Sequence, residues 1–264
     1  MAEDVRIGVG GALGRMGRAV TAIVHGREGA RLAGRFDRPG APEDAAAESL
    51  ADRPAVLAAC DVIIDFSTGP ATAALAEAAS ARGGPALVIG ATGLTAAEDD
   101  AVRRAAEQVA IVRSGNYSVG VNVLAGLVEQ AARRLPAEIW DIEVVEAHHR
   151  RKIDAPSGTA LMLAEAAARG RGRPLADLAL PPRDGVTGPR PQGAIGLAAL
   201  RGGGIVGEHS VMFAAEEEII TLSHSARDRA LFARGAVEAA LWVAGRPPGL
   251  YDMIDVLGFR DSPR

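Results

Sequence analysis

Residues 5–17, VRIGVGGALGRMG, carry the clearest signal for the fold of the amino-terminal part of the chain. The first five residues form an apolar run that predicts a strand, and a helical pattern follows the last glycine. Between them, Gly11, Gly14 and Gly17 have G-x-x-G-x-x-G spacing. Glycines at such a turn let the backbone approach a pyrophosphate, and the helix amino end supplies N–H donors. The strict G-x-G-x-x-G spacing is absent, so a tight turn that needs small residues for packing remains an alternative.

Asp37 favours the nucleotide interpretation. It lies about twenty residues beyond the last glycine, at the end of a second predicted strand over residues 30–36, where a carboxylate meets the hydroxyls of the adenosine ribose. Arg38 beside it would instead bind a 2′-phosphate. The pair therefore predicts NADH or NADPH as cofactor, and we interpret it as dual use.

Strand-like and helical runs alternate as far as residue 118, which predicts an α/β fold with a Rossmann-like, doubly wound parallel sheet. Beyond this point a long helix and a long strand are followed by three strand-like runs, between residues 195 and 224, without intervening helices. That pattern predicts a second α+β domain on an open mixed sheet. We expect a dinucleotide-binding domain over 1–118 and 228–264, and a substrate-binding and oligomerisation domain over 119–227.

Two further turns follow predicted parallel strands. Gly90-Ala91-Thr92 and Ser114-Gly115-Asn116-Tyr117 both stand at the carboxyl edge, where ligands bind in such sheets. We assign them to the nicotinamide half of the cofactor. Ordinary connections between strand and helix are the alternative interpretation.

The stretch EAHHRRKIDAPSGTA, residues 146–160, carries the richest chemistry. It brings two imidazoles, two guanidinium groups, an ammonium and a Ser-Gly-Thr turn to the end of a predicted strand, and a helix follows. Proton donors beside a helix amino end suit a small, multiply anionic substrate that must be held and protonated. Paired histidines in a basic run are also common on solvated surfaces. His209 and His224, further along the chain, are interpreted as strand residues with mostly structural roles.

Composition excludes several classes of protein. The formal net charge is −4, which argues against binding to nucleic acid or anionic membranes, and no apolar run approaches the roughly 20 residues that span a bilayer. The single cysteine, Cys60, cannot form an internal disulfide, so a cytoplasmic protein is expected. We interpret Cys60 as a buried small hydrophobe. No histidine or cysteine spacing is typical of a metal site, so no metal is predicted.

Over nearly its whole length the chain resembles the 4-hydroxy-tetrahydrodipicolinate reductase (dihydrodipicolinate reductase) family. The resemblance is carried by VGGALGRMGRAV, VIIDFS, VIGATG, GNYSVGVN, EAHHRRKIDAPSGTA, GEHSVMF, LFARGAVEAALWV and GLYDMIDVL. It implies a Rossmann domain completed by the carboxy-terminal helix and a substrate domain whose sheet builds a homotetramer. It further implies NADH or NADPH as hydride donor and a small cyclic dicarboxylate as substrate.

The resemblance also implies roles by position. His148 matches the proton donor and acceptor, Lys152 the second proton donor, His149 a substrate contact, and Gly158 with Thr159 the pair that binds a substrate carboxylate. The positions that match cofactor contacts are Gly11, Ala12, Leu13, Gly14, Arg15, Met16, Asp37, Arg38, Gly90, Ala91, Thr92, Ser114, Gly115, Asn116 and Tyr117. The chain departs from the family pattern at Ala91, where threonine is usual, and at Arg151, where histidine is frequent.

The expected activity is NAD(P)H-dependent reduction of 4-hydroxy-tetrahydrodipicolinate to tetrahydrodipicolinate, in diaminopimelate and lysine biosynthesis. The hydride would come from nicotinamide C4 and the proton from His148 with Lys152. Two alternatives stay open: a two-domain nicotinamide oxidoreductase acting on another imine or oxo acid, and a dinucleotide sensor without catalysis. A sensor needs no proton donor, so variants of His148 and Lys152 distinguish it from an enzyme.

Overall fold

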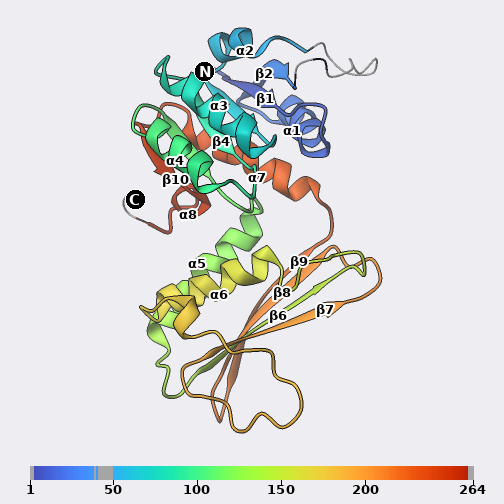
Figure 1. Cartoon of the computed structure of the whole chain (residues 1–264), viewed down its shortest axis with the longest axis vertical. Coiled ribbons are helices and arrows are strands. Elements are labelled where there is room, and N and C mark those ends of the chain that lie inside the picture. The colour runs from blue at the N-terminus through green and yellow to red at the C-terminus, as the bar shows by residue number, and fades with distance from the viewer. Residues whose placement is uncertain (1–2, 39, 41–49, 261–264) are drawn as a thin grey trace. The chain divides into compact units, whose positions relative to one another are not determined.

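The computed structural model describes residues 3–38, 40 and 50–260 of the 264 residues (Figure 1). Its internal contacts divide the chain into two units: unit 1 comprises Met1–Val119 and Ala230–Arg264, and unit 2 comprises Gly120–Arg229. The roles predicted for the two domains remain predictions.

Unit 1 is built on a six-stranded sheet in which every neighbouring pair is parallel. In spatial order β10-β5-β4-β3-β1-β2, the strands are β10 (Gly249–Tyr251), β5 (Ala110–Arg113), β4 (Ala86–Ile89), β3 (Val62–Asp65), β1 (Val5–Gly10) and β2 (Ala30–Phe36). The predicted doubly wound parallel sheet is confirmed. Strand β10 was not predicted, because three residues are too few to show a periodicity of two.

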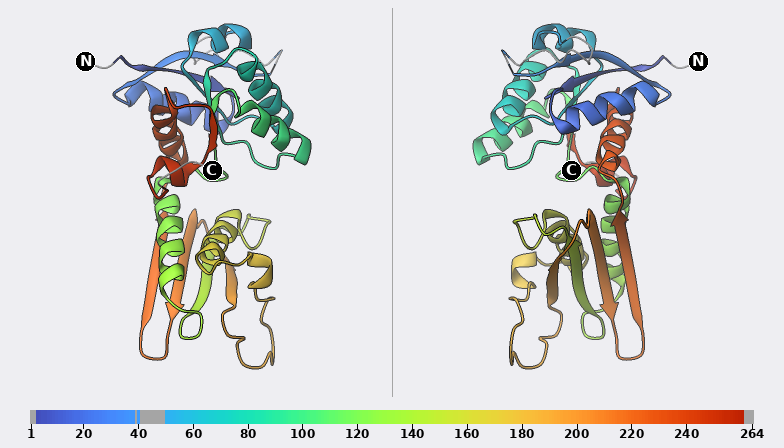
Figure 2. Two further views of the ribbon diagram at one scale, coloured as in Figure 1. Left: turned by 90° about the vertical axis from the view of Figure 1, so that its left-hand side faces the viewer. Right: turned by 90° about the vertical axis from the view of Figure 1, so that its right-hand side faces the viewer.

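Helices cover both faces of this sheet (Figure 2). On one face α1 (Arg15–Gly26) and α7 (Ala230–Val243) pack on Ile7, Val9 and neighbouring strand residues. On the other face α2 (Arg53–Ala59), α3 (Gly69–Ser80) and α4 (Ala96–Ala105) cover a second core that includes Ile63 and Leu87. A short helix, α8 (Met253–Val256), follows β10. The strands are therefore apolar on both sides, as buried parallel strands require.

Unit 2 contains a four-stranded mixed sheet in the order β7-β6-β8-β9. Its strands are β6 (Asp141–His148), β7 (Ile195–Arg201), β8 (Gly207–Ala214) and β9 (Ile219–Ala226). β7 is parallel to β6, whereas β8 is antiparallel to both β6 and β9. The predicted second domain on an open mixed sheet is thus confirmed.

One face of the mixed sheet is covered by helix α6 (Gly158–Gly170), which packs across β6, β7 and β8. Helix α5 (Val119–Arg134) lies beside α6, and Arg169 of α6 donates a hydrogen bond to Glu129 of α5. A 3₁₀ turn, η1 (Leu175–Asp177), follows α6. Alternate residues of β6 are buried, and the last two of these are Glu146 and His148. The pleat therefore places two ionisable groups side by side on a buried face.

Among the residues that the structure describes, no helix is long and apolar enough to cross a membrane.

Candidate active site

The glycine-rich loop of unit 1 has the tight geometry that a pyrophosphate site needs. Gly11 adopts a φ of +67°, in the left-handed region that favours glycine. A Cβ atom at Gly17 would overlap the carbonyl oxygen of Gly11 and lie 2.6 Å from Cα of Ala12, so only glycine lets α1 approach the loop this closely. In the described part of the chain no side chain caps the amino end of α1. Its first N–H groups and the helix dipole are therefore suited to an anion.

Asp37 links this loop to the end of β2. Its carboxylate accepts a hydrogen bond from the backbone N–H of Leu13 at 2.8 Å and another from that of Arg38, also at 2.8 Å. Each carboxylate oxygen retains a further lone pair, which a ribose hydroxyl can use. Arg38 is exposed. The geometry thus fits a dinucleotide, with the Asp37 carboxylate bonded to the loop and the exposed Arg38 next to it in the chain.

The other predicted cofactor positions follow β4 and β5 at the same carboxyl edge. Ser114 donates its hydroxyl proton to the carbonyl of Asn116 at 2.7 Å, which closes a local turn. Tyr117 is 2 % exposed, and its hydroxyl lies 2.8 Å from the carbonyl oxygen of Ile89 and 3.0 Å from that of Val112. The phenol therefore belongs to the core, and a cofactor contact at Tyr117 would use its backbone.

In unit 2, His148 is the last residue of β6 and bonds to a buried carboxylate. Its Nδ1 lies 2.6 Å from Oε2 of Glu146, two residues earlier on the same face of the strand. The parallel register of β7 places Arg201 opposite His148, and the antiparallel register of β8 places His209 opposite Glu146. Strand pairing alone therefore assembles four polar side chains around the end of β6.

Glu146 is 1 % exposed and fully engaged in hydrogen bonds. The guanidinium of Arg201 donates to its two oxygens at 2.7 and 2.8 Å, and the backbone N–H of Ser157 donates at 3.0 Å. Burial by itself would raise the pKa of Glu146, but hydrogen bonds from Arg201, His148 and Ser157 outweigh burial and hold that pKa below its usual value. The carboxylate is therefore ionised at neutral pH.

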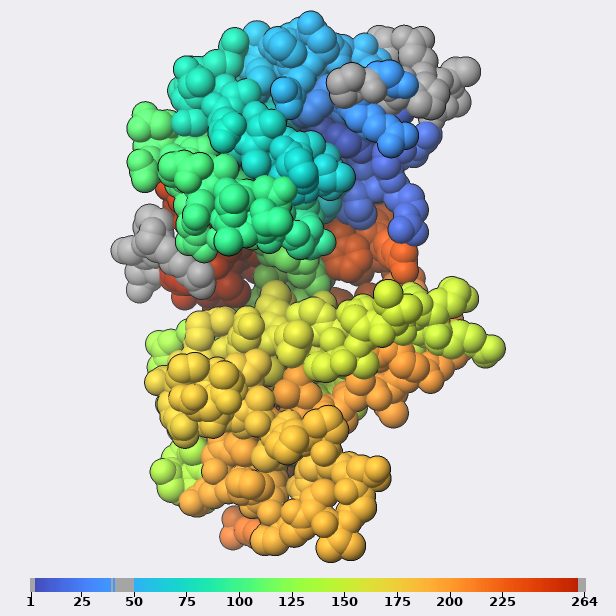
Figure 3. Space-filling view, viewed as in Figure 1, coloured from blue at the N-terminus to red at the C-terminus, as the bar shows by residue number. Residues whose placement is uncertain are grey.

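Lys152 lies on the exposed loop after β6, residues 150–154, which projects from the surface of unit 2 as the yellow-green segment in Figure 3. Its Nζ is 2.9 Å from Oδ2 of Asp154. Arg201 donates a further hydrogen bond to the backbone carbonyl of Asp154 at 2.7 Å, which ties this loop to the Glu146 carboxylate. On His149, Nδ1 is buried and has no hydrogen-bond partner within the described chain. A substrate contact by His149 would therefore use Nε2.

Helix α6 presents its amino end beside this cluster. Ser157 is the N-cap, and its hydroxyl oxygen accepts from the N–H of Ala160 at 3.2 Å. Gly158 and Thr159 are the first two helical residues, and a Cβ at Gly158 would meet nothing within 4 Å. Backbone groups at this position can approach a carboxylate closely.

His209 is a buried neighbour of the cluster. It is 4 % exposed, its Nε2 lies 3.3 Å from the hydroxyl of Ser157, and its ring packs edge-on against His148 with centroids 5.1 Å apart. Burial and the adjacent His148 lower the pKa of His209 to about 4. At neutral pH this ring is uncharged.

We expect His209 to make unit 2 less stable in mild acid. An unfolded histidine has a pKa of about 6.5, so between that value and the folded pKa of about 4 the unfolded chain binds a proton that the folded chain does not. The free energy of unfolding should therefore fall as pH is lowered through this window. Urea unfolding at about pH 7 and about pH 5 should show a smaller fall in His209→Gln than in the wild type. His25→Gln, at an exposed position, is the control; equal falls in all three proteins would refute the assignment.

The structure adds four residues to the site that the sequence interpretation did not assign: Glu146, Ser157, Arg201 and His209. Glu146 had an overlooked signal, because a residue two positions before His148 on a strand must share its face. Arg201 and His209 are 53 and 61 positions beyond His148 in the sequence, respectively, and only the register of β7 and β8 brings them there.

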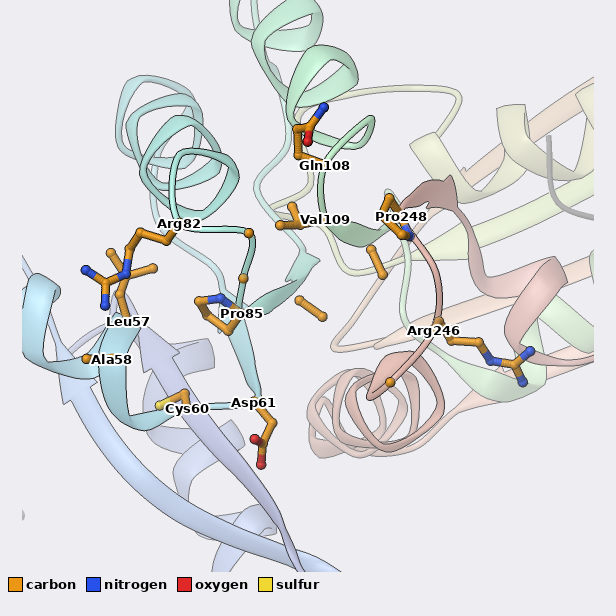
Figure 4. A pocket seen from close by; sticks show the side chains of 15 residues that line it. Leu57, Ala58, Cys60, Asp61, Arg82, Pro85, Gln108, Val109, Arg246 and Pro248 are labelled. Atoms are coloured by element: carbon orange, nitrogen blue, oxygen red, sulfur yellow. The ribbon is translucent and has the colours of Figure 1, made fainter.

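A hollow of about 740 Å³ lies at the opposite edge of the unit 1 sheet, at the amino ends of β3, β4, β5 and β10 (Figure 4). It contains none of the predicted site residues. Cys60 on its wall is buried, and burial together with the adjacent Asp61 raises the pKa of its thiol to about 11. The thiol therefore stays protonated, as expected of a small buried hydrophobe. Asp61 is paired with Arg6 at 2.6 Å.

Comparison with known proteins matches both units. The family model described as "Dihydrodipicolinate reductase, N-terminus" matches residues 5–117, and "Dihydrodipicolinate reductase, C-terminus" matches residues 120–257. A 4-hydroxy-tetrahydrodipicolinate reductase of Caulobacter vibrioides is 61% identical over 260 residues, which cover 98% of this chain and 100% of that protein. The same-named protein of Sinorhizobium medicae is 49% identical over 268 residues, covering 97% and 98% of the two chains.

Among solved structures, the dipicolinate-bound dihydrodipicolinate reductase from Paenisporosarcina sp. TG-14 has a similar fold. The TM-score is 0.78 at 22% identity, and the match covers 96% of this chain and 98% of that one. At 22% identity, this similarity shows a shared fold.

Proposed function

The chain belongs to the dihydrodipicolinate reductase family, and from that membership we propose how its two units share the reaction. The reaction is the reduction of 4-hydroxy-tetrahydrodipicolinate in diaminopimelate and lysine biosynthesis, so the chain is an oxidoreductase. Unit 1 binds the nicotinamide dinucleotide on its glycine-rich loop, and unit 2 binds and protonates the substrate. The observation that supports the role of unit 2 in protonation is the buried Glu146–His148 pair at the end of β6.

A nicotinamide cofactor supplies the hydride, and the chain binds it through residues of unit 1. The N–H groups at the start of α1 face the pyrophosphate, and Asp37 accepts from the ribose hydroxyls. Arg38 neutralises a 2′-phosphate when NADPH is bound. Because Asp37 is bonded to the loop and the exposed Arg38 follows it directly in the chain, both NADH and NADPH are used.

His148 delivers the proton that follows the hydride. An imidazole suits proton transfer at neutral pH, and this one is held at a strand end by a carboxylate 2.6 Å away. Lys152 assists as a second donor and stabilises developing negative charge. Its ion pair with Asp154 is on an exposed loop, and such pairs contribute only about 0–1 kcal/mol. The ammonium can therefore exchange Asp154 for a substrate carboxylate at little cost.

The substrate carboxylates bind at the start of α6. The N–H groups of Gly158 and Thr159, together with the hydroxyl of Thr159, hold one carboxylate at the positive end of the helix dipole. His149 contacts the substrate through Nε2. Ala91 lacks the hydroxyl that the family's usual threonine would place beside the nicotinamide, and Arg151 adds a cation where histidine is frequent. Neither departure removes a residue to which the proposal gives a role in binding or catalysis.

The assay that tests this function is oxidation of NADH and NADPH by the purified protein. Substrate is made in situ from pyruvate and aspartate semialdehyde by the preceding synthase. We expect oxidation with both cofactors that depends on the synthase. Cofactor binding without synthase-dependent oxidation would point to another imine or oxo acid, or to a dinucleotide sensor.

Lys152→Ala should weaken substrate binding and slow the reaction. Loss of the ammonium removes a charge-assisted hydrogen bond to a carboxylate, so we expect KM to rise and kcat to fall, each by roughly tenfold. Steady-state kinetics with Arg151→Ala as the control separates Lys152 from the general charge of the loop. An effect confined to NADH affinity would contradict the site as proposed.

The proposal extends to assembly and location: a cytoplasmic homotetramer formed through the mixed sheet of unit 2. In support, the strands of this sheet carry exposed apolar side chains, with Leu200 60% and Ile219 64% exposed, and such exposure is typical of an interface. Size-exclusion chromatography with multi-angle light scattering measures the molar mass of the assembly directly. A monomer would refute the tetramer and leave the chemistry of the site intact.

A further inference from the structure

We propose that Glu146, held by Arg201, is a positioning residue that fixes the tautomer and orientation of His148, so that Nδ1 carries a proton toward Glu146 and Nε2 exchanges the proton of the reaction. The inference rests on the proposed role of His148 as proton donor and names the atom that performs it. Neither Glu146 nor Arg201 contacts the reacting atoms in this account. Both act through the imidazole.

The tautomer follows from the chemistry of the partner. An ionised carboxylate only accepts hydrogen bonds, and Oε2 of Glu146 lies 2.6 Å from Nδ1 of His148. Nδ1 must therefore carry a hydrogen in both the neutral and the protonated ring. The second proton, which the ring gains and loses, then resides on Nε2.

Arg201 keeps Glu146 ionised and in place. Its two terminal nitrogens donate to the two carboxylate oxygens at 2.7 and 2.8 Å in a bidentate pair. The guanidinium is itself fixed by the backbone carbonyls of Leu200 at 2.6 Å and Asp154 at 2.7 Å. Because Glu146 is 1% exposed, water does not compete for these bonds. Bidentate geometry of this kind leaves the carboxylate one orientation.

Gly207 of β8 lies close to Nε2. A Cβ atom there would be 3.2 Å from Nε2, tighter than most Cβ contacts, so a side chain at position 207 would crowd this nitrogen. The charged and titratable groups that contact the ring or stand opposite it in the sheet are Glu146 on β6, Arg201 on β7 and His209 on β8. Lys152, on the loop after β6, acts electrostatically on His209. His209 is uncharged at neutral pH, so Glu146 is the one anion that bonds to the ring within the described chain.

The same ion pair connects the proton donor to both substrate-binding segments. Glu146 accepts from the N–H of Ser157, the N-cap of α6, and Arg201 donates to the carbonyl of Asp154 on the loop of Lys152. A carboxylate that moved would therefore disturb the helix end and the loop together. A glutamine at position 146 keeps an oxygen that can accept a hydrogen bond from Ser157 or Arg201, and it removes the negative charge of the carboxylate.

Glu146→Gln tests the proposal. We expect kcat to fall by about 10²-fold, because a misplaced ring of the wrong tautomer transfers protons poorly, while KM and the Kd for NADH stay within about threefold. The limb of the pH–kcat profile that reports the imidazole should move to lower pH, because an amide stabilises the imidazolium less than a carboxylate does. A purely structural role would move neither this limb nor the ring tautomer.

Glu143→Gln is the matched control. Glu143 stands three residues earlier on β6, on the opposite face, and also pairs with an arginine, Arg190, at 2.9 Å. Its loss removes a glutamate–arginine pair from the same strand without touching His148. We expect unchanged kcat and an unchanged pH profile.

Nitrogen-15 NMR of the His148 ring gives a readout independent of turnover. A protonated Nδ1 and an unprotonated Nε2 in the neutral wild type, with a mixture of tautomers in Glu146→Gln, support the proposal. A wild-type protein without reductase activity would refute the proposed function, and the NMR result would still decide the tautomer. An active wild type with equal kcat and an equal spectrum in Glu146→Gln would overturn the proposal.

A second variant covers a failure of Glu146→Gln to fold, since the half-buried Arg201 would lose its carboxylate partner. The double variant Glu146→Leu with Arg201→Met removes both charges, a change that buried ion pairs often tolerate. We expect a folded protein with the same loss of kcat. Wild-type kcat in the double variant would overturn the proposal.

Discussion

His148→Gln should lower kcat by about 10²–10⁴-fold, the range that general acid catalysis contributes. Glutamine is close to histidine in size and polarity, but it cannot gain and lose a proton near neutral pH. The Kd for NADH or NADPH should stay near the wild-type value, because the residues proposed to bind the cofactor all belong to unit 1. Steady-state kinetics together with a fluorescence titration of the cofactor measures both quantities.

His224→Gln is the control for this prediction. His224 lies on β9 of the same mixed sheet, opposite His209, and it has no role in the proposed proton transfer. Its replacement should leave kcat within about threefold of wild type, as expected away from the reacting atoms. Unchanged turnover in His148→Gln would remove this histidine from the mechanism and favour a dinucleotide sensor.

Gly17→Ala should weaken binding of NADH and NADPH by at least about tenfold, or about 1.4 kcal/mol. The added Cβ would overlap the carbonyl oxygen of Gly11 and lie 2.6 Å from Cα of Ala12, and both are backbone atoms that cannot rotate away. The loop and α1 must therefore separate, which moves the N–H groups that we propose bind the pyrophosphate. Overpacking of this kind also lowers the free energy of unfolding, by about 1–3 kcal/mol.

Gly26→Ala provides the matched control at the other end of α1. A Cβ there would meet nothing within 4 Å, and alanine favours the helix over glycine. We expect unchanged cofactor affinity and equal or slightly higher stability, measured by cofactor titration and by thermal unfolding. Wild-type affinity in Gly17→Ala would show that the cofactor does not depend on the close approach of α1 to this loop.

Much of the fold was predictable because its signals are local. The run over residues 30–36 reads as a strand and is β2 as the structure has it, Ala30–Phe36. The glycine spacing over residues 11–17 marks a strand, a turn and a helix in immediate succession, and these are β1, the loop and α1. Strand β10 escaped prediction, because it is short and is held by pairing with β5, far away in the sequence.

The candidate site was predictable only in part. Residues 146–160 place two histidines, a lysine and a helix start within one short stretch, so proximity along the chain made them visible. Tyr117 shows the limit of such inference, because its position in a turn did not reveal that its hydroxyl bonds to two strand carbonyls in the core.

The doubly wound sheet, the second domain on a mixed sheet and the stretch that carries the chemistry could all be inferred from the order of the amino acids. Hydrophobic periodicity, glycine spacing and clusters of polar side chains each extend over only a few residues. They can therefore be recognised without knowing which distant residues pack against them. The bond between His148 and Glu146, and the hold of Arg201 on this carboxylate, became visible only in the folded chain. Arg201 is 55 residues from Glu146, and the register of two parallel strands brings them together. Because Glu146 is buried and Arg201 donates to both of its oxygens, the bidentate pair holds the carboxylate in one orientation.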